Sequence, residues 1–339
     1  MEKPDVHLRE FAARHHHRPH YRRVAQLSVG RAVGQPVLKS SCKTSRTAFL
    51  REGKGGFCCR RNEFKALNDA NVELELLDRE CILAELTGTA RAWLGRLDVH
   101  PVLDSTNDYL LARVGEDWPS GSVCLTEQQQ AGRGRLGRSW LSPFAASLAG
   151  SLLWRFNLPA VALSGLSLAT GIAVARALRN FGVAEVGLKW PNDVWWCGRK
   201  LGGILLESGG SSGAFAVVAG VGLNVALPPP AAAAIEQPWV DLREILGVER
   251  LSRNRLAVLL IGELIETFVR FQRGGFADLA AEWAGFDQVA GRRVRLTLPN
   301  ATLTGIARGV DTTGALVLET ADGRLQSCVG GEISLRLES

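Results

Sequence analysis

The 339-residue sequence predicts an α+β protein that combines a mixed β-sheet with grouped helices and ends in a small all-β region. Strand-like apolar runs follow one another between residues 186 and 227, with only turn residues between them. A doubly wound α/β protein would instead alternate strands and helices. Helical patterns are concentrated at 163–182 and 252–286, and short β runs follow Gly291.

This pattern divides the chain into a basic extension over residues 1–70, a main domain over 71–288 and a β domain over 289–339. Residues 1–61 contain 14 Lys and Arg against 4 Asp and Glu, whereas the remainder contains 26 against 30. The extension is therefore suited to weak, non-specific contact with nucleic acid. A disordered basic segment is the favoured interpretation, because periodic patterns are weak there.

The first half of the main domain mixes both kinds of pattern. Residues 72–86 have helix-compatible spacing. A strand, a turn and a helix follow, and Ser105 or Thr106 is placed to cap that helix. Buried strands are predicted at 122–129 and 147–156, on either side of a loop rich in Arg and Gly.

The second half begins with a helix over 163–182, which Gly182 is expected to end. Residues 228–238 read as a surface loop, and two helices follow it, of which the first opens at Ser252. The strand-like runs between these helices lie at 186–191, 193–196, 200–208 and 214–227. Turn signals within the β domain lie at Pro299–Asn300, Asp311–Gly314 and Asp322–Gly323.

Composition indicates a cytoplasmic protein. No apolar run reaches the roughly 18 residues that span a bilayer, and the first 20 residues lack the apolar core of a secretory signal. The seven cysteines contain no C-x-x-C pair, which argues against a disulfide framework and fits a reducing compartment. No residue spacing matches a standard metal site, so no metal ligands are predicted.

The most informative segment is QQAGRGRLGRSW at 129–140. Three glycines alternate with Arg133, Arg135 and Arg138, so that backbone N–H groups and guanidinium groups can converge on an anion. A solvated basic turn is the alternative, and a motif of this length alone would not exclude it.

Other motifs occur downstream in a fixed order, and together with the loop they closely resemble the biotin protein ligase family. They are DSTND at 104–108, KWPNDV at 189–194, RKLGGILLE at 199–207, GVGLNV at 220–225, GVDTTGALVLE at 309–319 and GGEISLR at 330–336. The resemblance covers roughly residues 80–339. It implies a mixed-sheet catalytic domain of the biotin/lipoate ligase type, followed by a small SH3-like β-barrel domain.

The resemblance also implies an ATP-dependent ligase that forms a C–N bond. Such an enzyme activates biotin to biotinyl-5'-AMP, with Mg²⁺ on the ATP phosphates, and transfers biotin to a lysine of the biotin carboxyl carrier protein of acetyl-CoA carboxylase. Two anions meet in the first step, so cationic side chains must offset their repulsion. After the Arg/Gly loop, Lys200 is the strongest candidate, because a lysine at the start of a buried strand usually meets an anion.

Matching the family's motifs residue by residue gives three candidate sets. The catalytic set is Lys200, Arg133 and Arg135. The biotin-binding set is Ser105, Thr106, Asn107, Gln129, Gly132, Arg133, Gly134, Arg135, Lys200 and Gly203. The ATP-binding set is Arg138, Trp140, Asn192, Asp193, Lys200, Asn224 and Arg336.

Structural roles compete with several of these assignments. The DSTN residues suit a helix N-cap, Trp140 suits a buried core, and Asn192 and Asp193 suit an Asx turn. Arg336 is the weakest transfer, because it comes from the small domain.

Two other functions stay open from the sequence. A ligase that also represses transcription would need a winged helix-turn-helix before residue 75. Only residues 45–57 weakly resemble part of such a motif, a recognition helix followed by a wing. A lipoyl or octanoyl transferase on a related fold is the other alternative, and the Arg/Gly loop and the C-terminal GGEISLR segment argue against it. A homodimer and binding to DNA also stay open, and no membrane contact is expected.

Overall fold

The computed structural model describes residues 65–67, 73–116, 118–209, 215–330 and 333–338. Every described element belongs to the unit that residues 58–339 form. The weak helix-turn-helix resemblance at 45–57 lies outside the described residues, and so does most of the predicted extension. The domain boundaries near residues 70 and 289 therefore stay predictions.

The main domain is built on a seven-stranded mixed sheet in the order β3-β4-β5-β9-β8-β7-β6. β3 and β4 are parallel, and the other neighbouring strands of this sheet are antiparallel. Its strands are β3 (Arg96–Leu103), β4 (Ser122–Gln129), β5 (Ser147–Phe156), β6 (Val186–Lys189), β7 (Asp193–Trp196), β8 (Arg199–Gly209) and β9 (Phe215–Asn224). The mixed sheet and its strands confirm the predicted fold class.

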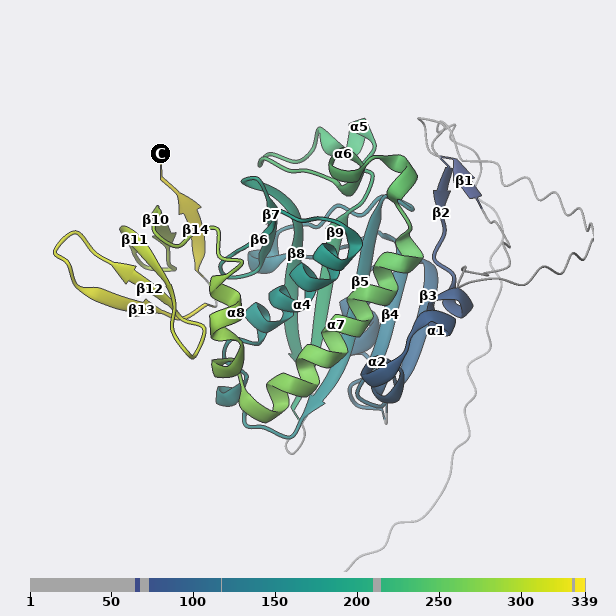
Figure 1. The fold of residues 1–339 in the computed structure, drawn as a ribbon, viewed down its shortest axis with the longest axis horizontal. Coiled ribbons are helices and arrows are strands. Elements are labelled where there is room, and N and C mark those ends of the chain that lie inside the picture. Colours follow the sequence, from purple (N-terminus) through teal and green to yellow (C-terminus); the bar gives the residue numbers. More distant parts are fainter. Residues whose placement is uncertain (1–64, 68–72, 117, 210–214, 331–332, 339) are drawn as a thin grey trace, which may run out of the picture. The chain divides into compact units, whose positions relative to one another are not determined.

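Two long helices, α4 (Leu166–Phe181) and α7 (Arg253–Gly274), lie across one face of the sheet (Figure 1). Gly182 ends α4 in the left-handed conformation, with φ at 116°, as the sequence predicts. The short helix α3 (Thr106–Leu111) packs on the other face, where Leu110 belongs to a separate apolar cluster with residues of β4, β5 and β9. The sheet is therefore covered on both sides.

No unbroken apolar run of about 18 residues was expected, but Ala160–Phe181 is one helical segment long and apolar enough, by length and composition alone, to cross a membrane. Its mean hydropathy is 1.6 over an 18-residue window. In the structure 61% of that window is buried inside the domain, where α4 packs against α7 and the sheet. Small residues such as Gly and Ser separate the apolar ones, so the mean hydropathy is high although no apolar run is unbroken. A helix buried in the core of a domain has this composition.

The helix predicted over 72–86 forms only in its second half, as α1 (Arg79–Glu85). The first half contains the strand β2 (Glu73–Glu75), which pairs antiparallel with β1 (Lys65–Leu67). Asp78 accepts hydrogen bonds from the backbone N–H groups of the second and third helical residues, 2.9 and 3.0 Å away. This N-cap fixes where the helix begins.

The remaining helical elements are short. These helices are α2 (Gly88–Trp93), α5 (Pro229–Ala232), α6 (Leu242–Leu246) and α8 (Ala280–Ala284), with 3₁₀ turns η1 (Arg135–Gly137), η2 (Ala160–Leu163), η3 (Val248–Arg250) and η4 (Ala277–Leu279). Helix α5 lies within the predicted loop 228–238.

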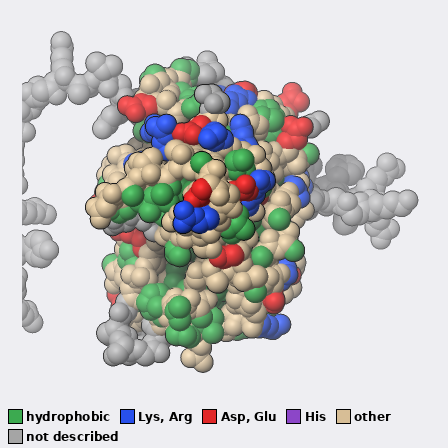
Figure 2. All heavy atoms as spheres, turned by 90° about the vertical axis from the view of Figure 1, so that its left-hand side faces the viewer, with side chains coloured by type: hydrophobic (Ala, Val, Ile, Leu, Met, Phe, Trp, Pro, Cys, Tyr) green, Lys and Arg blue, Asp and Glu red, His purple; other side chains and the backbone are tan. Residues whose placement is uncertain are grey.

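The β domain is a five-stranded antiparallel sheet in the order β13-β12-β11-β10-β14, in agreement with the small SH3-like domain implied by the sequence. Its strands are β10 (Arg293–Thr297), β11 (Thr302–Val310), β12 (Leu316–Glu319), β13 (Leu325–Cys328) and β14 (Ser334–Leu337). The Trp190 indole N–H donates to the Gly314 carbonyl oxygen, 3.1 Å away, and so joins this domain to the main one. Acidic and basic side chains of the described residues are interspersed on the face in Figure 2.

Candidate active site

Polar side chains from α3, β4 and β5 form one buried network. Gln129 Oε1 accepts hydrogen bonds from the Thr106 backbone N–H at 2.9 Å and from the Thr106 hydroxyl at 3.1 Å. Ser151 Oγ lies 2.7 Å from Thr106 Oγ1 and 2.6 Å from Asn107 Oδ1. An amide oxygen can only accept, so the Ser151 hydroxyl donates to Asn107. The network thus orients both amides, and among the described residues the Gln129 NH₂ group has no acceptor.

The DSTND segment also has the structural role that competes with ligand binding. Ser105 Oγ accepts from the Asp108 backbone N–H, 3.3 Å away, which confirms the capping interpretation for Ser105. Ser105, Thr106 and Asn107 are each at most 5% exposed. A Cβ at Gly220 would overlap the Asn107 amide, so this glycine of β9 makes room for the polar cluster.

The Arg/Gly loop is folded back on itself. The Gly134 N–H donates to the Arg138 carbonyl oxygen at 2.7 Å, and the Trp140 N–H donates to the Gly132 carbonyl oxygen at 2.8 Å. At the tip, Leu136 has a φ of 58°, which is the left-handed conformation. For a residue with a side chain this conformation costs roughly 1–2 kcal/mol. The backbone at the tip is therefore strained.

The first loop arginine, Arg133, makes ion pairs with two carboxylates. Its Nη2 contacts Asp108 of α3 and lies 3.0 Å from Oε2 of Glu207 on β8. The side chains of Arg133 and Asp108 are about half exposed, whereas Glu207 is 24% exposed. This side chain therefore ties the loop to both neighbouring elements.

The second loop arginine, Arg135, points to a different part of the site. Its Nη1 donates to Asn192 Oδ1 at 3.0 Å, and its Nη2 donates to the Ile333 carbonyl oxygen of the β domain at 3.1 Å. Burial lowers the pKa of Arg135, while the Asp193 carboxylate acts in the opposite direction. A guanidinium remains charged at neutral pH under such conditions. The loop thus places a charge between the two domains.

Two lysines share one carboxylate beside this arginine. Lys200 Nζ lies 2.7 Å from Asp193 Oδ1, and Lys189 Nζ lies 3.6 Å from Asp193 Oδ2. All three side chains are at most 16% exposed. Burial lowers the pKa of Lys189, and the Asp193 carboxylate raises it. Two ammonium groups against one carboxylate leave a net positive charge, so the cluster is suited to an added anion.

Trp140 forms the wall between the loop and the sheet. A Cβ at Gly222 would lie 2.5 Å from the Trp140 ring, and one at Gly203 would lie 3.6 Å from it. Lys200 Nζ is 6.0 Å from the ring centroid. The indole N–H is buried without a hydrogen-bond partner among the described residues. Glycine at position 222 therefore creates the space that the aromatic ring fills, whereas a Cβ at position 203 would be in ordinary contact with the ring.

Other predicted residues lie apart from this cluster or have structural contacts. Asn224 Nδ2 donates to the carbonyl oxygens of Lys200 at 3.4 Å and of Val240 at 3.1 Å, so it fixes the backbone beneath Lys200. Arg138 is exposed. Arg336 is exposed on β14, opposite Arg295 of β10, and no contact joins it to the described loop residues.

Four residues of the cluster were missed by sequence reasoning: Asp108, Ser151, Lys189 and Glu207. Asp108, Lys189 and Glu207 stand inside the quoted motifs DSTND, KWPNDV and RKLGGILLE, so the motifs themselves contained the signal. Ser151 stands in an apolar strand, and only the pairing of β4 with β5 places it near α3.

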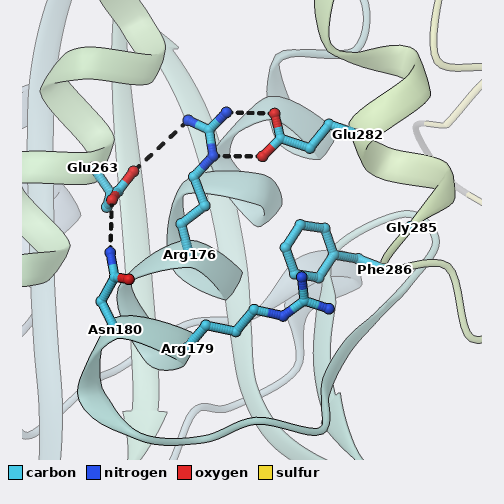
Figure 3. Close-up of a pocket in the computed structure, with 7 residues that line it drawn as sticks. All are labelled: Arg176, Arg179, Asn180, Glu263, Glu282, Gly285 and Phe286. Carbon is cyan, nitrogen blue, oxygen red and sulfur yellow. Dashed lines mark hydrogen bonds and ion pairs between the residues drawn. The ribbon is translucent and has the colours of Figure 1, made fainter.

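A separate cavity of about 470 Å³ lies between α4, α7 and α8 (Figure 3). Arg176 pairs there with Glu282 and Glu263, Asn180 donates to Glu263, and Arg179 stacks on the Phe286 ring. The acidic groups drawn in Figure 3 are thus already partnered. None of the predicted site residues lines this cavity.

Comparison with known proteins identifies the family. A model described as the biotin/lipoate A/B protein ligase family matches residues 99–224, and one described as the biotin protein ligase C terminal domain matches residues 289–336. The chain is 44% identical over 264 residues to the bifunctional ligase/repressor BirA of Escherichia coli, with 78% of this chain and 79% of the relative covered. The chain belongs to the biotin protein ligase family.

Two further relatives extend this comparison. The biotin--[acetyl-CoA-carboxylase] ligase of Mycobacterium tuberculosis is 37% identical over 267 residues, with 77% of this chain and 96% of the relative covered. A solved structure of the biotin protein ligase from Aquifex aeolicus in complex with biotin and ATP is 27% identical. Its TM-score is 0.61, and the match covers 72% of this chain and 99% of that one.

Proposed function

We propose that this chain activates biotin with ATP to biotinyl-5'-AMP and then transfers biotin to a lysine of a biotin carboxyl carrier protein. The relatives named above are biotin ligases, and one solved relative binds both biotin and ATP. The observation that supports this chemistry most directly is the convergence of Arg135, Lys189 and Lys200 around one carboxylate, Asp193.

In the first step a biotin carboxylate oxygen attacks the α-phosphorus of ATP, and pyrophosphate leaves. The reactants are both anions, so the excess positive charge of the cluster lowers the barrier between them. In the second step the neutral amine of a carrier lysine attacks the acyl carbon, AMP leaves, and the nitrogen loses its proton. Neither step needs a nucleophile from the enzyme.

The residues divide between the two ligands in this proposal. The Gln129 NH₂ group, oriented by its bonds to Thr106, offers a donor to the ureido head of biotin, and the glycines Gly132, Gly134 and Gly203 let the backbone approach the ligand. Trp140 offers an aromatic face to the adenine base. Arg133 and Arg135 hold the loop closed, which would protect the anhydride from water.

Magnesium is proposed as a partner of ATP rather than as a resident ion. Both Asp193 oxygens contact lysine ammonium groups, so this carboxylate is already compensated. Mg²⁺ is commonly held by substrate phosphates together with one or two carboxylates. Because lysines already engage both Asp193 oxygens, we assign the ion to the ATP phosphates and give Asp193 no direct ligand role. Magnesium neutralises phosphate charge when bound.

The decisive experiment is incubation of the full chain with ATP, Mg²⁺, biotin and a carrier domain. Mass spectrometry should find biotin on one carrier lysine. Lipoate or octanoate in place of biotin tests the alternative transferase activity, and the family match over residues 289–336 favours biotin. Modification with lipoate alone would contradict the proposal.

A second function, transcriptional repression, is suggested only by a relative's name, bifunctional ligase/repressor. The segment that would carry it lies in residues 1–70, mostly outside the described residues. Biotin-dependent operator binding by the full chain, lost in a chain that begins at Asn71, would support it. We place the protein in the cytoplasm, because the proposed reaction consumes ATP and the cysteines fit a reducing compartment.

A further inference from the structure

Glu207 is a charged residue of the cluster to which neither the motifs nor the proposed reaction assign a role. It lies near the end of β8, and its side chain is 24% exposed. Two predicted site residues from different elements meet at the same atom, Oε2. Asn107 Nδ2 of α3 donates to it at 2.7 Å, and Arg133 Nη2 of the Arg/Gly loop donates to it at 3.0 Å.

The Asn107 side has other supports. Asn107 Oδ1 accepts from Ser151 at 2.6 Å, and its Nδ2 also donates to the Leu205 carbonyl oxygen at 3.2 Å. A neutral acceptor at position 207 could replace the carboxylate on this side, because the amide needs only an oxygen lone pair. The Asn107 contact therefore gives no reason for a charge at Glu207.

The Arg133 side does need a charge. Backbone hydrogen bonds hold the start of the loop: the Gln130 N–H donates to the Leu103 carbonyl oxygen at 2.8 Å, and the Ala131 N–H donates to the Asp104 carbonyl oxygen at 2.9 Å. Beyond Ala131, the ties of the loop to α3 and β8 come from the Arg133 side chain. Arg133 has two carboxylate partners, and they are not equivalent. Asp108 is 50% exposed and is screened by solvent, whereas Glu207 is half as exposed and is held in place by Asn107.

We propose that Glu207 is a positioning residue that holds the Arg/Gly loop closed through Arg133. The proposal rests on the proposed function for its consequence, which is retention of the activated intermediate. Glu207 itself does not touch the reacting atoms. Its carboxylate compensates the Arg133 guanidinium, and the Asn107 amide keeps that carboxylate in place.

The test uses Glu207→Gln, Arg133→Ala and the double variant in the full chain. Glutamine still accepts from Asn107 but loses the charge that attracts Arg133, so the change isolates the loop contact. Glu244→Gln is the matched control. It removes a carboxylate on α6 that lies 2.7 Å from Arg199, a residue of β8 away from the loop. Glu207→Asp keeps the charge and should restore part of the effect.

Hydrogen exchange of the ligand-free protein is the first measurement. We expect amides of residues 133–140 to exchange roughly threefold to tenfold faster in Glu207→Gln, since the tie to Asp108 remains. The control should match the parent chain. In the Arg133→Ala background the Glu207→Gln change should add nothing, because Glu207 acts through Arg133.

Two results of this ligand-free measurement would overturn the proposal. One is an unchanged exchange rate of the loop amides in Glu207→Gln. The other is an increase caused by Glu207→Gln that is equally large in the parent chain and in the Arg133→Ala background. Release of labelled biotinyl-AMP in a chase experiment is the second measurement, and it should accelerate by a similar factor. Failure of the parent chain to form biotinyl-AMP would instead count against the proposed function, while the exchange result would still decide the role of Glu207. A general loss of protection across the sheet would show that Glu207 is needed for folding and would also overturn the proposal.

Discussion

Lys200→Ala tests the electrostatic part of the proposed reaction. Lys200 Nζ lies 2.7 Å from Asp193, and its side chain is 16% exposed, so it is a fixed and largely desolvated cation. Removing one preorganised group that stabilises charge in a transition state typically costs about 2.7–4 kcal/mol. We therefore expect adenylate formation to fall at least about a hundredfold, which corresponds to about 2.7 kcal/mol.

The structure also limits how far this substitution can disturb folding. Breaking a buried ion pair usually costs about 3–5 kcal/mol when the remaining charge is left uncompensated. Here Lys189 stays 3.6 Å from the other Asp193 oxygen, so the carboxylate keeps a cationic partner. The loss of unfolding free energy should therefore be about 1 kcal/mol, well below the effect on catalysis.

The assay is biotin-dependent pyrophosphate release in a single turnover, measured beside urea unfolding of the same preparation. Lys200→Arg serves as the control, because it keeps the charge while changing the geometry. Pyrophosphate release at the parental rate in Lys200→Ala would refute the reasoning and make Lys200 a structural residue. A loss of unfolding free energy of the full buried-pair size would show that Lys189 does not compensate Asp193.

Three further predictions follow from other contacts. Arg253→Met leaves the buried Glu127 carboxylate without its partner at 2.5 Å, so urea unfolding should show a loss of about 3–5 kcal/mol, whereas an exposed pair would give less than about 1 kcal/mol. Gly222→Ala forces the Trp140 ring to move; ATP titrations should show affinity weakened at least about tenfold, and unchanged affinity would remove Trp140 from the nucleotide site. Burial lowers the pKa of Lys189 below the ordinary value of 10.5. Between the lowered pKa and 10.5 the unfolded chain therefore binds more protons than the folded chain. In that range the unfolding free energy of the parent chain should rise with pH relative to that of Lys189→Met. Urea unfolding across that range checks the sign, and a falling difference would contradict it.

Sequence patterns were sufficient to predict the sheet and the long helices, because the buried face of a helix or strand makes apolar residues recur at a fixed spacing. β5 is apolar and buried along almost its whole length, and Gly182 ends α4 as its conformation requires. The pattern was insufficient over 72–86, where helix-compatible spacing extends into β2. There the partner strand β1 and the Asp78 cap decide the structure, and neither is visible in a periodicity.

The candidate site shows the same division between local and long-range information. Motif residues identified the groups of the cluster, but the partners of each charge depend on chain segments far apart in sequence. Arg133 meets a carboxylate 74 positions away, and Arg135 meets a carbonyl group 198 positions away. Arg336 illustrates the limit: its motif fits the family, yet its strand places it on an exposed face opposite another arginine.

The two central loop arginines point in different directions, and this has a consequence for how the loop can move. Arg133 is tied to α3 and β8, whereas Arg135 is tied to Asn192 and to the backbone of the β domain at Ile333. The strained tip at Leu136 lies next to Arg135. Because Arg133 and Arg135 have different partners, loss of the Arg133 contacts leaves the contacts of Arg135 with Asn192 and the β domain in place. We therefore expect Arg133 and Arg135 substitutions to have independent effects on retention of the intermediate, which a double-mutant cycle would measure as additive.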